Sequence, residues 1–117
     1  MEEITFGALK LSVKNENDDQ YIIFKGKSDD RDPSVFLKPF FDQTINDIKG
    51  SLFLDFSQLL FMNSSTIPPL IYFIRNLDLK GIKTTFYYNS DSKWQCTSFK
   101  AFNTISTHLK NISIMCK

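Results

Sequence analysis

The chain has 117 residues, of which 42% are hydrophobic, and its formal net charge is +1. This length and apolar content predict one compact domain, residues 1–117, and exclude a disordered chain or a second core. No apolar run approaches the roughly 20 residues that span a bilayer, and the N-terminal segment lacks a secretory pattern. We therefore expect a cytoplasmic protein with no membrane partner.

Charge, cysteine and histidine content narrow the function classes. Residues 80–117 hold six Lys and one Asp, whereas residues 1–79 hold eight basic and twelve acidic side chains, a polarity too weak and scattered to predict a nucleic acid partner. Cys96 and Cys116 are isolated, and His108 has no Cys or carboxylate at ligand spacing, so we expect no metal and no cofactor. The absence of a Gly-rich phosphate loop or a Ser/His/Asp constellation argues against an enzyme.

Two antiparallel strands are predicted first. Apolar residues alternate along residues 4–8 and change phase along residues 9–13, which we interpret as one strand with a bulge near Gly7. The polar residues 15–19 then turn the chain into a second strand at 20–27, so that the opening unit is a hairpin.

A helix is predicted next, because Asp32 before Pro33 is a good helix start and Gly50 a good stop. Pro39 should make this helix irregular or delay its start. Its apolar positions recur at helical spacing and are Phe36, Phe40 or Phe41, Ile45 and Ile48.

The remaining elements alternate between strands and helices. Residues 51–57, SLFLDFS, form a nearly continuous apolar run, the pattern of a central strand covered on both faces. A helix ending at Gly81, a strand at 82–88, a helix from Lys93 and a short strand at 112–115 follow. The two helical stripes are Leu70, Ile71, Ile74 and Leu77, and Phe99, Phe102, Ile105 and Leu109. This order predicts an α/β fold with a mostly parallel central sheet, an N-terminal antiparallel hairpin and three main helices.

Residues 61–70, FMNSSTIPPL, join the central strand to the next helix, at the sheet edge where sites gather. Ser65 or Thr66 is expected to cap the helix and Pro68 to begin it, and capping alone is one interpretation of the segment. The other interpretation is phosphorylation, because helix dipole and free amides stabilise a phosphate there, although Pro68 and Pro69 each remove an amide.

The segment SLFLDFSQLLFMNSSTIPPLIYFIRNLDLKGIKTTFYY resembles the core of a STAS domain, the fold of bacterial anti-sigma factor antagonists, or anti-anti-sigma factors. In that family a strand ending in Asp precedes an apolar run, the letters DSSG, an amphipathic helix, a Gly and another strand. Asp55 matches the strand-end Asp and Asn63 the motif Asp. Ser64 matches the serine phosphorylated by the partner kinase and Ser65 the second serine, while Thr66 replaces the Gly.

The C-terminal segment SKWQCTSFKAFNTISTHLKNISI resembles a narrower group of small cyanobacterial and proteobacterial STAS-like regulators that carry NSSG and a Trp-Gln segment. The letters NSS are also similar to the NTSS of a biofilm-regulating STAS-like family, in which the residue after Asn is phosphorylated. Trp94 and Gln95 carry this part of the resemblance, and we expect Trp94 to anchor the core or its rim.

The resemblance implies a non-enzymatic, anti-sigma factor antagonist-like bacterial signalling regulator. It implies protein–protein binding that is switched by phosphorylation of Ser64, or alternatively of Ser65. The implied partners are a serine kinase or anti-sigma-like protein and a PP2C-type phosphatase. The expected partner-binding residues are Asn63, Ser64, Ser65, Thr66, Arg75 and Asn76. The alternative is a STAS-like structural or small-ligand-binding module without phosphorylation.

Overall fold

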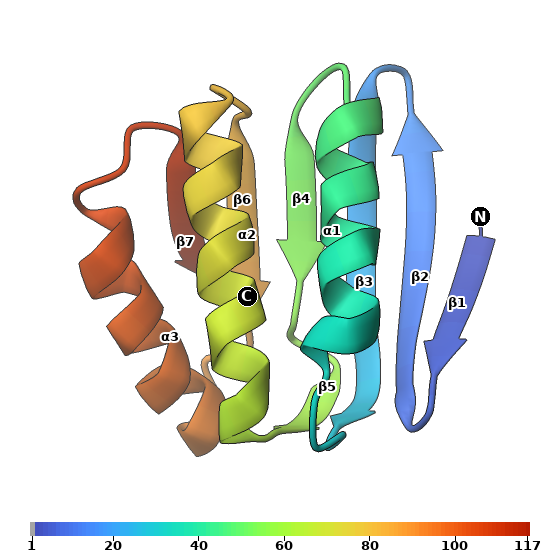
Figure 1. The fold of residues 1–117 in the computed structure, drawn as a ribbon. Helices are drawn as coiled ribbons and strands as arrows, with labels where there is room; N and C mark the ends of the chain where they lie inside the picture. The colour runs from blue at the N-terminus through green and yellow to red at the C-terminus, as the bar shows by residue number, and fades with distance from the viewer. Residues whose placement is uncertain (1) are drawn as a thin grey trace.

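In a computed structural model, which describes residues 2–117, three helices cover one face of a seven-stranded sheet (Figure 1). No helix in this range is both long and apolar enough to cross a membrane. The strands are β1 (Glu2–Phe6), β2 (Leu9–Glu16), β3 (Asp19–Ser28), β4 (Leu52–Asp55), β5 (Leu59–Met62), β6 (Thr84–Tyr88) and β7 (Ile112–Cys116). The helices are α1 (Ser34–Asp47), α2 (Ile67–Leu79) and α3 (Lys93–Ser106), with a 3-10 turn, η1 (Ser64–Thr66), before α2.

The sheet order is β1-β2-β3-β4-β6-β7. The first three strands are antiparallel, while β4, β6 and β7 pair in parallel, so the predicted α/β class and mostly parallel sheet are confirmed. Strand β5 was not predicted. It pairs in parallel with the second half of β3, beyond the part of β3 that pairs with β4.

The phase change near Gly7 is a turn between two strands, so the predicted bulge is wrong. Phe6 pairs with Leu9 across that turn, and Gly7 adopts a positive φ of 59°, a conformation that costs glycine little. A bulge and a tight turn both shift the alternation by one position, which is why the sequence pattern alone did not separate them.

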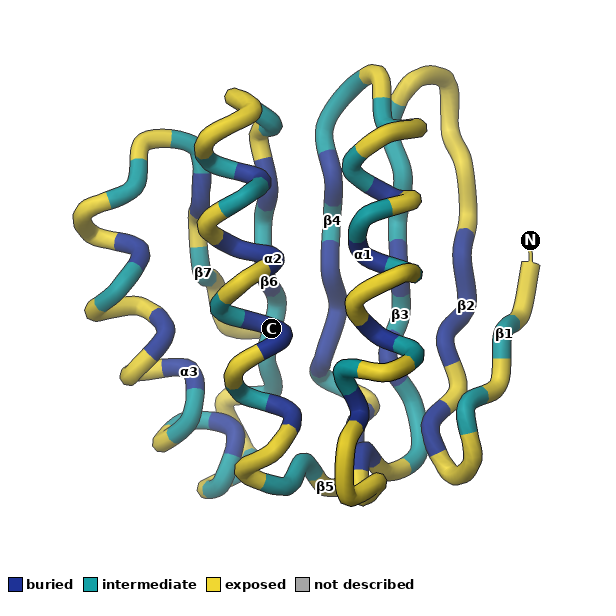
Figure 2. The backbone as a smooth tube through the Cα atoms, viewed as in Figure 1, coloured by how far each residue is buried: buried dark blue, intermediate teal, exposed yellow. Residues whose placement is uncertain are grey.

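Strand β4 lies centrally, as predicted, but only one of its faces is covered. Leu52 and Leu54 point toward the helices and are fully buried, whereas Phe53 points the other way and is partly exposed. Figure 2 shows the same contrast in the helices, whose buried residues recur on one side of each. The prediction of a strand covered on both faces was therefore wrong.

Stacked phenylalanine rings hold the helices to the sheet and to one another. The rings of Phe41 in α1 and Phe73 in α2 lie parallel, with centroids 4.0 Å apart. Phe56, just after β4, stacks on Phe24 of β3 at 4.2 Å and also contacts Phe99 of α3 at 5.2 Å. The high aromatic content of the chain thus fills one interior layer.

The helix limits differ in detail from the prediction. Helix α1 accommodates Pro39 in its interior, and its fully buried side chains are Leu37, Phe41 and Thr44, whereas Phe36, Phe40, Ile45 and Ile48 are partly buried. Helix α2 begins at Ile67, one residue before Pro68. Helix α3 ends at Ser106, so Leu109 packs against the core from the following loop.

Candidate functional site

The loop that follows β5 is fastened to the end of β3. The backbone N–H of Asn63 donates to the carbonyl of Ser28 at 2.9 Å, and the side-chain amide of Asn63 donates to the carbonyl of Asp30 at 2.6 Å. Both bonds link segments more than 30 residues apart in the sequence. The loop is therefore positioned by tertiary contacts as well as by the helix that it precedes.

Asn63 caps the helical segment. Its side-chain oxygen accepts from the backbone N–H of Thr66 at 3.1 Å and from the Thr66 hydroxyl at 2.7 Å. Thr66 stands at the N-cap position of α2, as predicted, but its side chain makes no capping hydrogen bond; Asn63 makes that bond instead, because the 3-10 turn η1 starts the helical segment one residue after Asn63. Asn is among the best capping residues, and such a cap contributes about 1 kcal/mol.

Thr66 lies beneath this loop. It is 3% exposed, and its hydroxyl also lies 2.7 Å from the hydroxyl of Ser28. The Thr66 proton goes to the Asn63 oxygen, which can only accept, so Ser28 must be the donor to Thr66. Thr66 was expected to contact a partner, but its burial makes it a support for the loop instead.

Ser64 and Ser65 are both exposed, and neither hydroxyl takes part in the capping bonds. Both side chains thus remain accessible to another protein. The loop brings together the predicted residues 63–65, while Arg75 and Asn76 lie two to three turns further along α2. Arg75 is exposed, and Asn76 donates its amide to the carbonyl of Tyr72 at 2.7 Å.

A continuous surface runs from Ser65 along the exposed side of α2, and we call it the α2 surface. It consists of two adjoining hollows of about 400 and 570 Å³, both lined by Pro68 and Tyr72. Ser65 lines the first hollow, whereas Arg75, Asn76 and Leu79 line the second. Ser64 lines neither hollow.

Helix α1 adds cationic side chains beside Ser65. Arg31, which precedes α1, and Lys38 line the same hollow as Ser65. The Lys38 ammonium lies 5.0 Å above the Tyr72 ring, and partial burial together with the hydrogen bond to Asp42 raises the pKa of Tyr72. Tyr72 is therefore neutral at physiological pH and links α1 to α2.

Large apolar side chains are exposed on the strand before the loop and at the far end of α2. Leu60 and Phe61 of β5 are 68% and 46% exposed, and Leu79 at the end of α2 is 83% exposed. Sequence reasoning missed these residues and also Arg31, Lys38 and Tyr72. Leu79 and Tyr72 fall outside the apolar stripe of α2, which was a usable signal, but the proximity of α1 to α2 is not encoded in any local pattern.

Asp55, the strand-end carboxylate, is 8% exposed and fully hydrogen-bonded. One oxygen accepts from the N–H and hydroxyl of Ser57, and the other lies 2.6 Å from the ammonium of Lys117. Burial raises the pKa of Asp55, but these hydrogen bonds outweigh it and leave the pKa below its ordinary value. Asp55 is thus an ionised structural link between β4 and the residue that follows β7.

Trp94 and Gln95, the Trp-Gln segment, contact the interior of the protein. Gln95 is 1% exposed, and its amide nitrogen donates to the carbonyls of Phe56 and Leu59, while its oxygen accepts from the N–H of Asn89. Trp94 is partly buried against the core, in agreement with an anchor at its rim. Gln95 therefore fixes the loop between β4 and β5 and the start of β5, the strand that leads to residues 63–65.

This chain is similar to known proteins in its fold. No protein-family model and no curated protein sequence matches it. An anti-sigma factor antagonist from Mycobacterium paratuberculosis is 11% identical, with 90% of this chain and 85% of that chain covered and a TM-score of 0.65. A chain in the crystal structure of diguanylate cyclase SiaD in complex with its activator SiaC from Pseudomonas aeruginosa is 13% identical over 100% of both chains, with a TM-score of 0.68.

A third solved structure is an uncharacterized protein of the DUF3478 family with a SpoIIAA-like fold from Shewanella loihica PV-4. It is 13% identical, with 100% of this chain and 91% of that chain covered and a TM-score of 0.51. At these identities the likeness concerns the course of the backbone. Together with the element order and the sheet topology, it shows that the chain has the STAS-like fold.

Proposed function

We propose that this protein is a non-enzymatic bacterial signalling regulator of the anti-sigma factor antagonist type. It binds a protein partner through the serine loop, residues 63–65, and the α2 surface. Phosphorylation of Ser64, with Ser65 as the alternative, switches that binding. The observation that carries the proposal is the pair of exposed serines on a loop that Asn63 caps and fastens.

The surface around the loop supports protein binding. Leu60, Phe61 and Leu79 are large apolar side chains at the surface, and Arg75 lies between the loop and Leu79 on α2. Apolar and Arg side chains are enriched where protein interfaces form. One of the structural matches is an activator bound to the enzyme that it activates, which supports the same class of action for this chain.

A phosphate at Ser64 would oppose binding by electrostatics. It carries about −1.5 to −2 charges at neutral pH, and Ser64 is exposed beside apolar residues that a partner would cover. Desolvating that charge against an apolar or acidic partner surface is unfavourable, so modification should release such a partner. The proposed partners are a serine kinase or anti-sigma-like protein and a PP2C-type phosphatase that restores binding.

A phosphate at Ser65 would behave differently. Arg31 and Lys38 share a hollow with Ser65 that Asp32 also lines, so the two cations can form charge-assisted bonds with a phosphate there, while the one carboxylate opposes it. A phosphate on Ser65 would therefore change the shape and contacts of the α2 surface, and the neighbouring cations would offset part of its charge. Ser65 is thus the better candidate for a phosphate that reshapes the surface, and Ser64 for one that repels a partner.

The test begins with the partner. Ser64→Ala protein, immobilised and exposed to a lysate of the source organism, should retain it, and mass spectrometry identifies it together with any serine kinase. Phosphopeptide mapping after incubation with that kinase should find phosphate on Ser64, or on Ser65. Phosphate on another residue, or on none, would remove the proposed switch.

Affinity measurements then separate the roles of the residues. Ser64→Asp should bind the partner at least tenfold more weakly than Ser64→Ala, while Ser113→Asp, on exposed β7 away from the loop, should bind normally. Arg75→Glu should weaken binding without changing Tm, because its side chain is exposed. Equal affinities for the Asp and Ala variants of Ser64 would leave the loop with a structural role only.

A further inference from the structure

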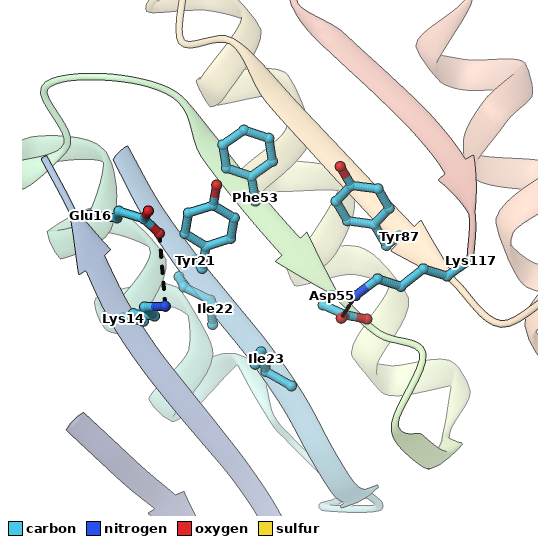
Figure 3. Close-up of a pocket in the computed structure, with 9 residues that line it drawn as sticks. All are labelled: Lys14, Glu16, Tyr21, Ile22, Ile23, Phe53, Asp55, Tyr87 and Lys117. Atoms are coloured by element: carbon cyan, nitrogen blue, oxygen red, sulfur yellow. Dashed lines mark hydrogen bonds and ion pairs between the residues drawn. The ribbon is translucent and has the colours of Figure 1, made fainter. Parts of the chain in front are cut away.

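The sheet face that no helix covers contains a hollow of about 480 Å³. Side chains from β2, β3, β4 and β6 line it, together with Lys117 (Figure 3). None of its lining residues belongs to the serine loop or to α2. Its volume is within the range of about 300 to 1,000 Å³ that is typical of small-ligand sites.

Aromatic rings from three neighbouring strands meet in this hollow. Tyr21 of β3 pairs in register with Phe53 of β4, and their rings stack with centroids 4.6 Å apart and an angle of 11°. Tyr87 of β6 stands on the other side of Phe53, one strand further along (Figure 3). All three rings are partly exposed, although they occupy the interior strands of the sheet.

Exposed aromatic rings on an open sheet are suited to stacking. A ring face that no other group covers can pack against another planar ring, and proteins hold nucleic acid bases by stacking of this kind. The Tyr21–Phe53 stack supports the sheet, but the helices cover only the opposite face, so these rings stay partly open to a ligand. The arrangement therefore leaves a partly exposed aromatic surface on which a flat aromatic ligand can pack.

The two lysines at opposite ends of the hollow differ in how readily they can bind an anionic group. Lys117 is held by Asp55 at 2.6 Å and lies 5.3 Å above the Tyr87 ring. Lys14 pairs with Glu16 at 3.8 Å, and both side chains are more than half exposed, so solvent screens this pair and it is weak. Lys14 can therefore turn to an incoming anion, whereas Lys117 stays with Asp55.

From this geometry we propose that the open sheet face binds a nucleotide-like ligand, an aromatic ring joined to an anionic group. The ring packs against Phe53 and Tyr87, on the side of Phe53 that Tyr21 does not cover, and the anionic group reaches toward Lys14. The ring faces and the available cation favour this ligand over a longer nucleic acid, since Glu16 and Asp55 balance the local lysines. The site is independent of the proposed partner-binding surface.

The test is an NMR titration of the full chain with adenosine monophosphate and guanosine monophosphate. At least one nucleotide should shift the amide resonances of Tyr21, Phe53 and Tyr87 in a saturable way. Ribose 5-phosphate, which lacks the ring, should bind about tenfold or more weakly. Phe53→Leu should weaken nucleotide binding, whereas Phe61→Leu, an exposed phenylalanine outside the hollow, should not.

Lys14→Gln separates the anionic contact from the stacking contact and, as an exposed substitution, leaves the fold intact. It should weaken adenosine monophosphate binding but leave the binding of adenosine unchanged. No saturable shift with either nucleotide overturns the proposal, as does equal affinity for ribose 5-phosphate. Shifts of the same residues that follow protein concentration without nucleotide would assign the face to a second copy of the chain and would also overturn it.

Discussion

Phe53 and Leu54 are neighbours on β4, yet they meet two different environments. Leu54 points toward the helices and is 0% exposed, while Phe53 points to the open face, stacks on Tyr21 and remains partly exposed. The two faces of this strand therefore differ in what their side chains contact. The covered face stabilises the fold by burial, and the open face holds aromatic and charged side chains that burial does not explain.

Replacing each neighbour by alanine should give the largest contrast between the faces. Leu54→Ala should reduce the free energy of unfolding by about 2 to 5 kcal/mol, because it leaves a cavity in the core. Phe53→Ala should cost about 1 to 2 kcal/mol, from lost strand preference and the lost pair with Tyr21. Urea denaturation measures both, and equal losses would contradict the one-sided core.

A second contrast concerns the loop, where Asn63 both donates and accepts. Asn63→Asp keeps the capping oxygen but loses the amide that donates to the carbonyl of Asp30, and it brings a carboxylate toward that carbonyl. We expect a loss of about 1 to 3 kcal/mol in urea denaturation. The exposed Asn46→Asp of α1 serves as control and should change little. If Asn63→Asp left the free energy of unfolding unchanged, the bond to the carbonyl of Asp30 would not be what holds the loop.

The ion pair between Asp55 and Lys117 on the open face should make the free energy of unfolding depend on pH in the acid range. The pKa of Asp55 is below its ordinary value of 3.8, so its contribution to stability is present above that pH and is lost as the pH falls through the folded-state pKa. Lys117→Met removes a lowering contact, so this variant should be less stable at neutral pH and converge with the parent protein at acid pH. The control is Lys110→Met, at an exposed lysine. Parallel pH profiles for the parent and Lys117→Met would exclude the ion pair as a source of stability.

The smallest effects are expected at the two serines of the loop. Because Asn63 is the cap, Ser64→Ala and Ser65→Ala should each change the free energy of unfolding by no more than about 0.5 kcal/mol. Thr66→Ala should cost more, since it leaves the buried Ser28 hydroxyl without its partner. A loss of about 1 kcal/mol for Ser65→Ala would restore the sequence-based assignment of the cap.

Periodicity was enough to predict most of the fold. The helical stripes and the apolar run of β4 predicted three helices and a central strand, because burial on one side leaves a repeat in the sequence. The turn at Gly7 and the short strand β5 were not predicted. A turn and a bulge leave the same phase change, and the four residues of β5 include two exposed apolar side chains that resemble core positions in a sequence.

The position of the serine loop was predicted from the sequence, but the residues that hold it and lie beside it were not. The motif located Asn63, Ser64 and Ser65 where a strand leads into a helix, and they do lie there, although the strand is β5 and not the central β4; their role in binding stays a prediction. The capping role moved to Asn63 because a 3-10 turn precedes α2, and a local pattern does not distinguish such a turn from the helix itself. Arg31 and Lys38 approach Ser65 only through the packing of α1 beside α2, which is a property of the tertiary fold.

Hydroxyl-radical footprinting of the complex with the isolated partner tests the central claim most directly. Partly exposed aromatic residues report contact at both places, Phe61 and Tyr72 near the serine loop and Tyr21, Phe53 and Tyr87 in the hollow of the open face. The account predicts that the partner protects Phe61 and Tyr72 and leaves the other three as reactive as in the free protein. Protection of Tyr21, Phe53 and Tyr87 with unchanged reactivity of Phe61 and Tyr72 would contradict it.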